Sequence, residues 1–353
     1  MIFYNAGVKN WDVIVIGGGI IGLSISLELK KHGAAVLVVE RGEPGREASY
    51  AAAGMLADTP IELPSELHAL ARASAKMYPE FVQQVEDESG LKVDLRDQGT
   101  IFLSAECNDH SLPAPLIELE PGLAEPEQPA KYFEERSVDP RALAAAVLQA
   151  ARHRGIDVSS GSTVTRVLVD DGHVTGVETD KTAYAAPAVV NCAGAWSGQV
   201  GPVQFPTRPV KGQMLALVGA RELLRHVIRT CDCYLVPRSD GRVVIGSTLE
   251  EAGFDKRTDA DTIHRLHLAA LKVVPKLARA RILESWAGLR PGTPDSLPLL
   301  GKTTTPGYFA ATGHFRDGIL LTPVTAEIMA RVITGGTPDY DISAFSPDRF
   351  LNT

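Results

Sequence analysis

The sequence predicts an α/β protein (α+β overall), with one domain around a parallel sheet and a second domain rich in antiparallel strands. Three observations support this fold class. A buried-type strand runs into a glycine-rich turn near residue 17, a second such strand ends in an acidic residue at position 40, and strand-rich stretches alternate with segments that return to the first pattern. The length of 353 residues agrees with two domains, because single cores rarely grow beyond about 300 residues.

The first pattern consists of a strand over residues 13–16, the turn Gly17-x-Gly19-x-x-Gly22, and a helix as far as Lys31. Gly17 permits the tight turn, Gly19 lets backbone N–H groups approach a pyrophosphate, and Gly22 lets the helix pack closely on the strand. The phosphates would lie at the helix N-terminus, where unpaired N–H groups favour negative charge. The pattern therefore predicts a Rossmann-type dinucleotide site.

The second observation is a strand over residues 35–39 that ends in Glu40, 18 residues after Gly22. A carboxylate at this place can accept hydrogen bonds from both ribose hydroxyls and would repel a 2′-phosphate. The motif alone does not separate NAD from FAD.

The remaining elements follow from periodicity and from start and stop signals. Asp139 and Pro140 are typical of a helix N-terminus, and Asp240-Gly241 is typical of a hairpin turn. A loop over residues 285–295, fixed by glycine and proline, carries one arginine. Helices are expected over residues 65–89, 139–154 and 259–276 and after 321; strands are expected over 100–103, 163–169, 174–178, 188–190, 211–218, 233–238, 242–248 and 308–312.

This order indicates that the chain leaves the dinucleotide domain twice and returns to it twice. The domain is expected to comprise residues 1–89, 137–203 and 287–353. Residues 90–136 and 204–286 would form the second, substrate-binding domain.

Composition excludes several classes of function. The net charge of −8 and the lack of a basic stripe argue against nucleic-acid binding, and no apolar run is long enough to span a membrane. The start of the chain shows no secretory signal. The four cysteines, Cys107, Cys192, Cys231 and Cys233, show neither disulfide-framework nor zinc spacing, which favours free thiols in a cytoplasmic setting and predicts no metal site.

Several longer motifs resemble the D-amino-acid oxidase family of FAD-dependent amine oxidoreductases, and within it the glycine oxidases of thiamin biosynthesis. The resemblance covers nearly the whole chain. The most specific motifs are Trp-Ala-Gly-Leu-Arg-Pro-Gly-Thr over residues 286–293 and Gly-His-Phe-Arg-Asp-Gly-Ile-Leu over residues 313–320. Residues 49–56, 210–212 and 233–238 add to it.

The resemblance implies FAD, bound non-covalently, as the cofactor. It places Glu40 and Arg41 at the adenosine ribose, Val164 at the adenine, and the turn of residues 314–320 at the pyrimidine edge of the flavin. Partial positive charge at that turn would stabilise anionic reduced flavin. The residues expected to bind FAD are Gly17, Gly19, Ile20, Ile21, Gly22, Glu40, Arg41, Ala48, Ser49, Ala53, Gly54, Met55, Val164, Ala193, Gly194, His314, Phe315, Arg316, Asp317, Gly318, Ile319 and Leu320.

For the substrate, the resemblance implies that Arg290 and Tyr234 bind a carboxylate. A guanidinium matches a carboxylate geometrically and stays charged. Arg316 is expected to face the substrate pocket and Leu249 to be an apolar residue beside it. His314 is expected to support the flavin loop and to transfer no proton. No catalytic base is predicted, because the flavin carries the chemistry.

The predicted reaction is oxidative deamination of glycine, sarcosine or a small D-amino acid. Hydride passes from Cα to flavin N5, and the products are an imino acid or oxo acid, ammonia and hydrogen peroxide. The alternative is a D-amino-acid or D-hydroxyproline dehydrogenase with an acceptor other than oxygen. A flavin-bearing structural or tRNA-modifying module and an NAD-dependent dehydrogenase fit fewer of the motifs. The resemblance also implies a homotetramer.

Overall fold

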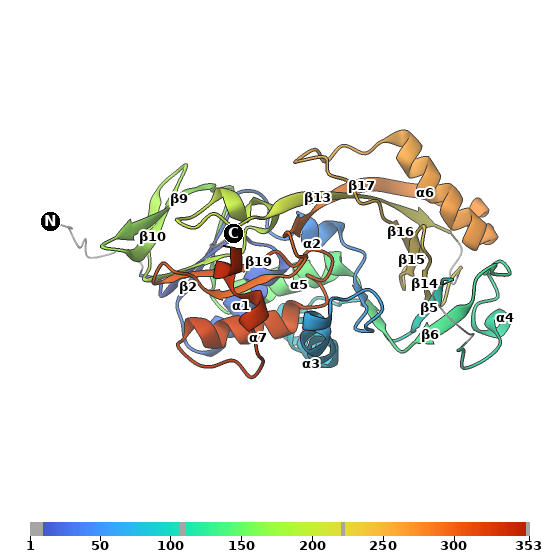
Figure 1. Cartoon of the computed structure of the whole chain (residues 1–353), viewed down its shortest axis with the longest axis horizontal. Helices are drawn as coiled ribbons and strands as arrows, with labels where there is room; N and C mark the ends of the chain where they lie inside the picture. Colours follow the sequence, from blue (N-terminus) through green and yellow to red (C-terminus); the bar gives the residue numbers. More distant parts are fainter. Residues whose placement is uncertain (1–9, 106–110, 220–222, 351–353) are drawn as a thin grey trace.

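The computed structural model describes residues 10–105, 111–219 and 223–350, and Cys107 lies outside this part. Figure 1 shows two parts side by side, one around a six-stranded sheet and one around a seven-stranded sheet. Two long strands connect them. In the described part, no helix is long and apolar enough to cross a membrane, and no cluster of His, Cys, Asp or Glu could hold a metal ion.

The six-stranded sheet has the order β18-β19-β12-β1-β2-β8 and is parallel except for β18. Its centre is β1, in which all four residues are buried. Parallel strands need cover on both faces, which explains the uninterrupted apolar runs that predicted them. The strands are β1 Val13–Ile16, β2 Val36–Glu40, β8 Asp157–Ser160, β12 Ala188–Asn191, β18 Leu299–Lys302 and β19 Tyr308–Thr312.

The two faces of this sheet have different covers. Val13 and Val15 pack with the helices, whereas Ile14 and Ile16 pack with a three-stranded sheet. The alternation follows from the two-residue period of a strand. The helices are α1 Ile20–Lys31, α3 His68–Ser89, α5 Pro140–His153 and α7 Thr322–Ile333, and the small sheet contains β9 Val164–Asp170, β10 His173–Thr179 and β11 Ala183–Ala185.

The predicted start of α5 and the predicted end of α3 are confirmed by their caps, whereas residues 65–67 before α3 form a 3₁₀ turn. The Asp139 carboxylate accepts a hydrogen bond from Arg141 N at 2.9 Å, and Pro140 occupies the first helical position of α5. Gly90 ends α3 in the left-handed conformation, with φ 71°.

The seven-stranded sheet has the order β17-β13-β16-β15-β14-β5-β6 and is antiparallel apart from the pair β14 and β5. Helix α6 packs on it through Leu266 and Ala270. This helix ends at Val273 rather than at the predicted residue 276, because Pro275 has no N–H to continue it. The strands are β5 Thr100–Leu103, β6 Ala130–Phe133, β13 Arg208–Val218, β14 Val227–Arg229, β15 Tyr234–Pro237, β16 Arg242–Gly246 and β17 Arg281–Gly292, and α6 is Ala260–Val273.

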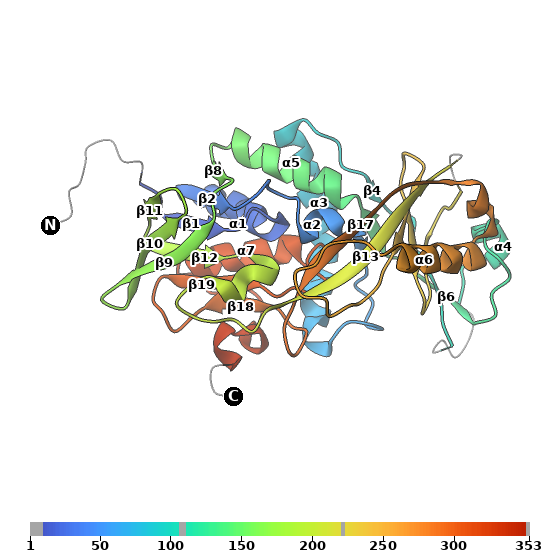
Figure 2. The ribbon, with the colours of Figure 1, turned by 90° about the horizontal axis from the view of Figure 1, so that it is seen from above.

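Strands β13 and β17 run side by side from one part to the other, as Figure 2 shows. The prediction of a loop over residues 285–295 is therefore wrong for its first eight residues, which belong to β17. Strand β17 lies at the edge of its sheet, where Pro291 is tolerated because no ladder hydrogen bond is lost. It also crosses the predicted domain boundary at residues 286 and 287; the domain division stays a prediction.

Several short elements complete the fold. Strands β3, β7 and β4 form a small antiparallel sheet. These elements are α2 Ala48–Ala51, β3 Met55–Leu56, β4 Leu95–Arg96, α4 Leu116–Leu119 and β7 Arg136–Val138, with 3₁₀ turns at Ser65–Leu67, Gly194–Gln199, Pro275–Arg279, Ser343–Phe345 and Pro347–Phe350.

Candidate active site and cofactor cleft

A cavity of about 660 Å³ lies between the two parts of the molecule. It begins at the carboxyl ends of β1, β2 and β12 and extends to the inner face of β13, β15 and β17. Open parallel sheets bind their ligands at this edge, and the volume falls in the usual range for ligand sites.

The structure brings nearly all of the predicted site residues to this cavity. Every residue predicted to bind FAD lines it except Gly22. A β-carbon on Gly22 would lie 2.1 Å from Gly17 O, so this glycine allows the helix to approach the turn. Tyr234, Arg290 and Arg316 also line the cavity.

The N-terminus of α1 points its backbone donors at the cavity. Ile20 N donates to Ser49 Oγ at 3.0 Å, whereas the N–H groups of Gly19 and Ile21 have no acceptor among the described residues. Gly17 has φ 105°, and a β-carbon there would lie 2.5 Å from Cys192 O. The turn therefore excludes a larger residue and leaves donors for an anion.

The Glu40 carboxylate is held in a fixed orientation at the end of β2. Its Oε2 accepts from Gly18 N at 2.8 Å, and its Oε1 accepts from Gly42 N at 2.8 Å. Each carboxylate oxygen can accept more than one hydrogen bond, so both remain able to bind hydroxyl groups.

Small residues 51–54 form a wall of the cavity, and the second part of the molecule anchors this wall. Trp286 Nε1 donates to Ala51 O at 3.1 Å, and the buried Arg238 donates to Ala53 O. Gly54 has φ 74°, and a β-carbon on it would lie 2.0 Å from Val138 O. The wall is thus fixed in place and free of bulky side chains, as a flat ring system requires.

The turn before α7 presents a second set of backbone donors. The N–H groups of Gly318, Ile319 and Leu320 have no acceptor in the described part of the chain. Tyr78 of α3 fixes the turn because its hydroxyl donates to Ile319 O. Donors at the N-terminus of α7 suit the carbonyl oxygens of a flavin. Together with the Glu40 carboxylate and the α1 donors, they fit FAD.

Two titratable groups lie in the same turn. His314 is buried against Thr325, with 3.2 Å between Nε2 and Oγ1, and burial lowers its pKa to about 3. It is therefore neutral. Burial raises the pKa of the Asp317 carboxyl to about 6, and Arg316 and Arg229 oppose this shift.

Arg290 lies on β17 with its guanidinium in the cavity. Nη1 donates to Thr248 O at 3.2 Å and Nη2 donates to Ser247 Oγ at 2.6 Å. Burial lowers the pKa of this guanidinium, although an arginine still remains charged. No carboxylate of the described residues forms an ion pair with it, so a half-buried positive charge faces the cavity without a carboxylate partner among them.

Two glycines make room for the predicted substrate-binding side chains. A β-carbon on Gly212 of β13 would lie 2.3 Å from Arg290 Nη1, and one on Gly246 of β16 would lie 2.5 Å from the Tyr234 hydroxyl. The Tyr234 hydroxyl lies 3.8 Å from Met214 Sδ.

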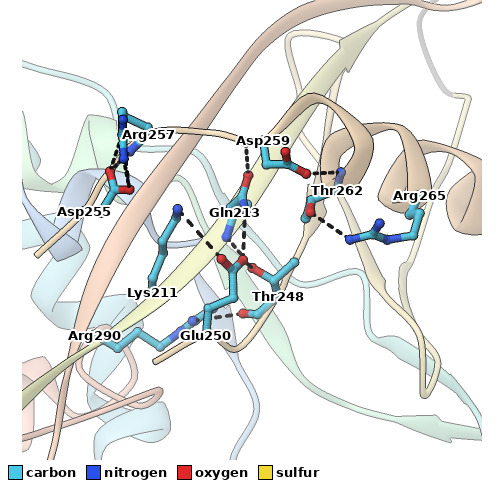
Figure 3. Close-up of polar contacts among 10 residues, drawn as sticks. All are labelled: Lys211, Gln213, Thr248, Glu250, Asp255, Arg257, Asp259, Thr262, Arg265 and Arg290. Atoms are coloured by element: carbon cyan, nitrogen blue, oxygen red, sulfur yellow. Dashed lines mark hydrogen bonds and ion pairs between the residues drawn. The ribbon is translucent and has the colours of Figure 1, made fainter. Parts of the chain in front are cut away.

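A network of hydrogen bonds, shown in Figure 3, holds the segment to which Arg290 donates. Gln213 N donates to Thr248 Oγ1 at 2.8 Å, and the Thr248 hydroxyl donates in turn to Glu250. Gln213 Nε2 donates to Glu250 Oε1 at 2.9 Å, and Lys211 Nζ lies 3.7 Å from Glu250 Oε2. The network extends to α6, because Asp259 N donates to Gln213 Oε1 at 2.7 Å.

Leu249 does not lie in the cavity lining, contrary to its predicted position. Its neighbours Thr248 and Glu250 bond to each other and to β13 on one face, so Leu249 points the other way and is 58% exposed. The prediction also missed lining residues that no local motif marks. They include Glu62, Trp196, Met214, Arg229 and Asp232.

A comparison with known protein families identifies the chain. The sequence matches the family described as DAO, FAD dependent oxidoreductase, over residues 12–332. The chain belongs to this family. FAD is therefore its cofactor.

Individual relatives of this DAO family member cover most of its length. A bifunctional protein ThiO/ThiG of Trichormus variabilis is 35% identical over 96% of the chain, which spans only 55% of that relative. A hydrogen cyanide synthase subunit HcnC of Pseudomonas aeruginosa is 30% identical over 97% of both proteins. The crystal structure of glycine oxidase from Geobacillus kaustophilus superposes with a TM-score of 0.92, at 31% identity, and covers 97% of this chain and 99% of that one.

Proposed function

We propose that this protein oxidises glycine and other small amino acids, such as sarcosine and small D-amino acids, with FAD as cofactor and oxygen as electron acceptor. The observation that carries the proposal is Arg290, a half-buried guanidinium that faces the cavity without a carboxylate partner among the described residues. Such a group favours binding of a small carboxylate. The likeness to a glycine oxidase structure supports glycine as the substrate.

The residues of this chain bind and orient the substrate. Arg290 would bind the carboxylate, since two of its N–H groups are held by Thr248 and Ser247 and its other N–H groups have no carboxylate acceptor among the described residues. Tyr234 lines the same region and would donate a second hydrogen bond from its hydroxyl. A substrate fixed at its carboxylate has its Cα in one place, which is the main contribution of positioning.

FAD, when bound, would supply the acceptor for the hydride that leaves the substrate Cα. The donors of residues 318–320 would favour the negative charge that this adds. The neutral His314 is held by Thr325 and serves the turn rather than proton transfer. The substrate amine would bind as the free base, so no protein base is required.

The test compares the amount of oxygen consumed with the amount of each product formed. Purified protein with FAD, glycine and oxygen should consume one oxygen for each glyoxylate, ammonia and hydrogen peroxide formed. Because one relative is named a hydrogen cyanide synthase subunit, cyanide is measured in the same samples. Cyanide in place of glyoxylate would contradict the proposed products. Oxidation of glycine by an artificial acceptor but not by oxygen would favour a dehydrogenase.

Further properties belong to this proposal. We expect a role in thiamin biosynthesis, in line with the resemblance to glycine oxidases of that pathway. We also expect a homotetramer in the cytoplasm with non-covalent FAD. Light scattering of the purified protein tests the homotetramer. Release of FAD on denaturation tests whether the cofactor is bound non-covalently.

A further inference from the structure

The segment between β16 and α6 belongs to the substrate-binding part but contacts the cofactor-binding part. In Figure 1 this orange-brown segment extends along β13 toward the first sheet. Two of its residues contact residues far away in the sequence: Phe254 through aromatic stacking and Lys256 through an ion pair. Their contacts are independent of the network behind Arg290.

Phe254 stacks on Trp196, which also contacts a cation. The ring centroids of Phe254 and Trp196 are 5.1 Å apart at an interplanar angle of 30°, and the Arg41 guanidinium lies 3.5 Å from the Trp196 centroid. Aromatic stacking and cation–π contacts of this kind are both favourable. Trp196 is therefore held by one residue of each part.

Lys256 makes a second connection nearby. Its ammonium lies 3.1 Å from Glu47 Oε2, and the same carboxylate accepts from Arg41 Nη2 at 3.0 Å through Oε1. Arg41 is thus fixed by Trp196 and by Glu47, and the β16–α6 segment touches both of these partners.

The residues held in this way line one end of the cavity. Arg41, Glu47 and Trp196 are lining residues, whereas Phe254 and Lys256 lie behind them. Arg41 follows directly after Glu40, the carboxylate at the position that binds a ribose in dinucleotide sites. This end of the cavity is therefore the adenosine end.

We propose that residues 251–258 form a latch that closes the adenosine end of the cavity and slows the release of FAD. Phe254 and Lys256 are positioning residues in this latch, and they act through Trp196 and Glu47. Neither side chain belongs to a buried core, since Phe254 is 42% exposed and Lys256 is 46% exposed. The proposal rests on FAD as the cofactor and not on glycine as the substrate.

The experiment measures the release of FAD from the holoprotein by the fluorescence of free FAD after removal of excess cofactor. We expect Phe254→Ala to release FAD roughly tenfold faster than wild type, the effect of losing one stacking contact. Lys256→Ala should accelerate release by about two- to threefold at low salt, because an exposed ion pair contributes little.

Arg257→Ala is the matched control. Arg257 is adjacent to Lys256 but pairs with Asp255 in the same segment, at 2.9 Å, and is 88% exposed (Figure 3). Release at the wild-type rate from Phe254→Ala and Lys256→Ala would overturn the proposal, as would equal acceleration in Arg257→Ala.

A second measurement separates the latch from a structural role. The unfolding temperature of the apoprotein should be the same in wild type and Lys256→Ala, while that of the FAD-loaded variant falls. If apoprotein and holoprotein lose stability equally, the contacts support the fold and the proposal is wrong. The exposed Lys256 provides this test even if Phe254→Ala fails to fold.

Discussion

The guanidinium of Arg290 lies directly over Gly212, on the neighbouring strand, so that a β-carbon at Gly212 would come within 2.3 Å of Nη1. In the ladder between β13 and β17, Arg290 pairs with Val210, which is two positions from Gly212 on the same strand, and this spacing keeps the two residues on one face of the sheet. A strand position without a side chain thus provides the space for the group that we expect to bind substrate.

Gly212→Ala should therefore displace Arg290 without removing it. We expect the KM for glycine to rise about tenfold, because the guanidinium must shift to make room for a methyl group. FAD content should stay at the wild-type level, measured by the ratio of absorbance at the flavin band to that of the protein. An unchanged KM would show that Arg290 has another position available.

Arg290→Lys tests the bidentate geometry rather than the charge. Lysine keeps the positive charge but cannot present two parallel N–H groups to a carboxylate. Loss of one charged hydrogen bond predicts a KM increase of about 10- to 100-fold with FAD retained. Steady-state kinetics of FAD-saturated protein provide the measurement. Loss of FAD in this variant would instead assign Arg290 a structural role.

Glu250→Ala tests the network behind Arg290. The carboxylate accepts from Thr248 and Gln213 and lies near the buried Lys211, so its loss frees the segment to which Arg290 donates. We expect a KM increase of about tenfold with little change in kcat. Glu251→Ala is the control, because Glu251 is exposed and pairs with Arg208 instead. Equal effects of the two substitutions would argue against a positioning role for Glu250.

We expect His314 to contribute to the pH dependence of the free energy of unfolding. Its pKa is about 3 in the folded protein and 6.5 in the unfolded chain, so the unfolded chain binds the proton first as pH falls below 6.5. The free energy of unfolding should therefore fall by about 2 kcal/mol between pH 7.5 and pH 5 through this residue. Asp317, with a raised pKa, opposes this change between pH 6 and pH 4.

Chemical unfolding of wild type and His314→Gln at both pH values isolates the histidine contribution. The variant retains Asp317, so the difference between the two proteins belongs to His314. The variant should lose less stability on acidification than wild type. An identical loss in both proteins would show that His314 is not buried in the neutral form.

The cofactor site could be predicted from local sequence because its main parts are local. The turn from Gly17 to Gly22 and the carboxylate of Glu40 follow from a strand, a turn and a helix that are contiguous in the chain. The helix cap at Asp139 is local as well. The geometry of such motifs is determined by residues that are neighbours in the sequence, so it can be predicted without knowledge of distant contacts.

The rest of the site depends on contacts between distant residues. Gln213 and Glu250 are 37 positions apart, and Trp196 and Phe254 belong to different parts of the molecule. No periodic pattern in the sequence indicates that such distant residues are in contact. The same reason explains the wrong position of Leu249, whose direction is set by the pairing of its neighbours with β13.

The most direct test of the account is the visible spectrum of the FAD-loaded protein in the absence of oxygen, before and after glycine is added, in wild type and Arg290→Lys. Wild type should lose its flavin absorbance at a glycine concentration about 10- to 100-fold below that needed by the variant, and should regain it when air enters. A wild-type flavin that stays oxidised with glycine, sarcosine and D-alanine would contradict the proposed function.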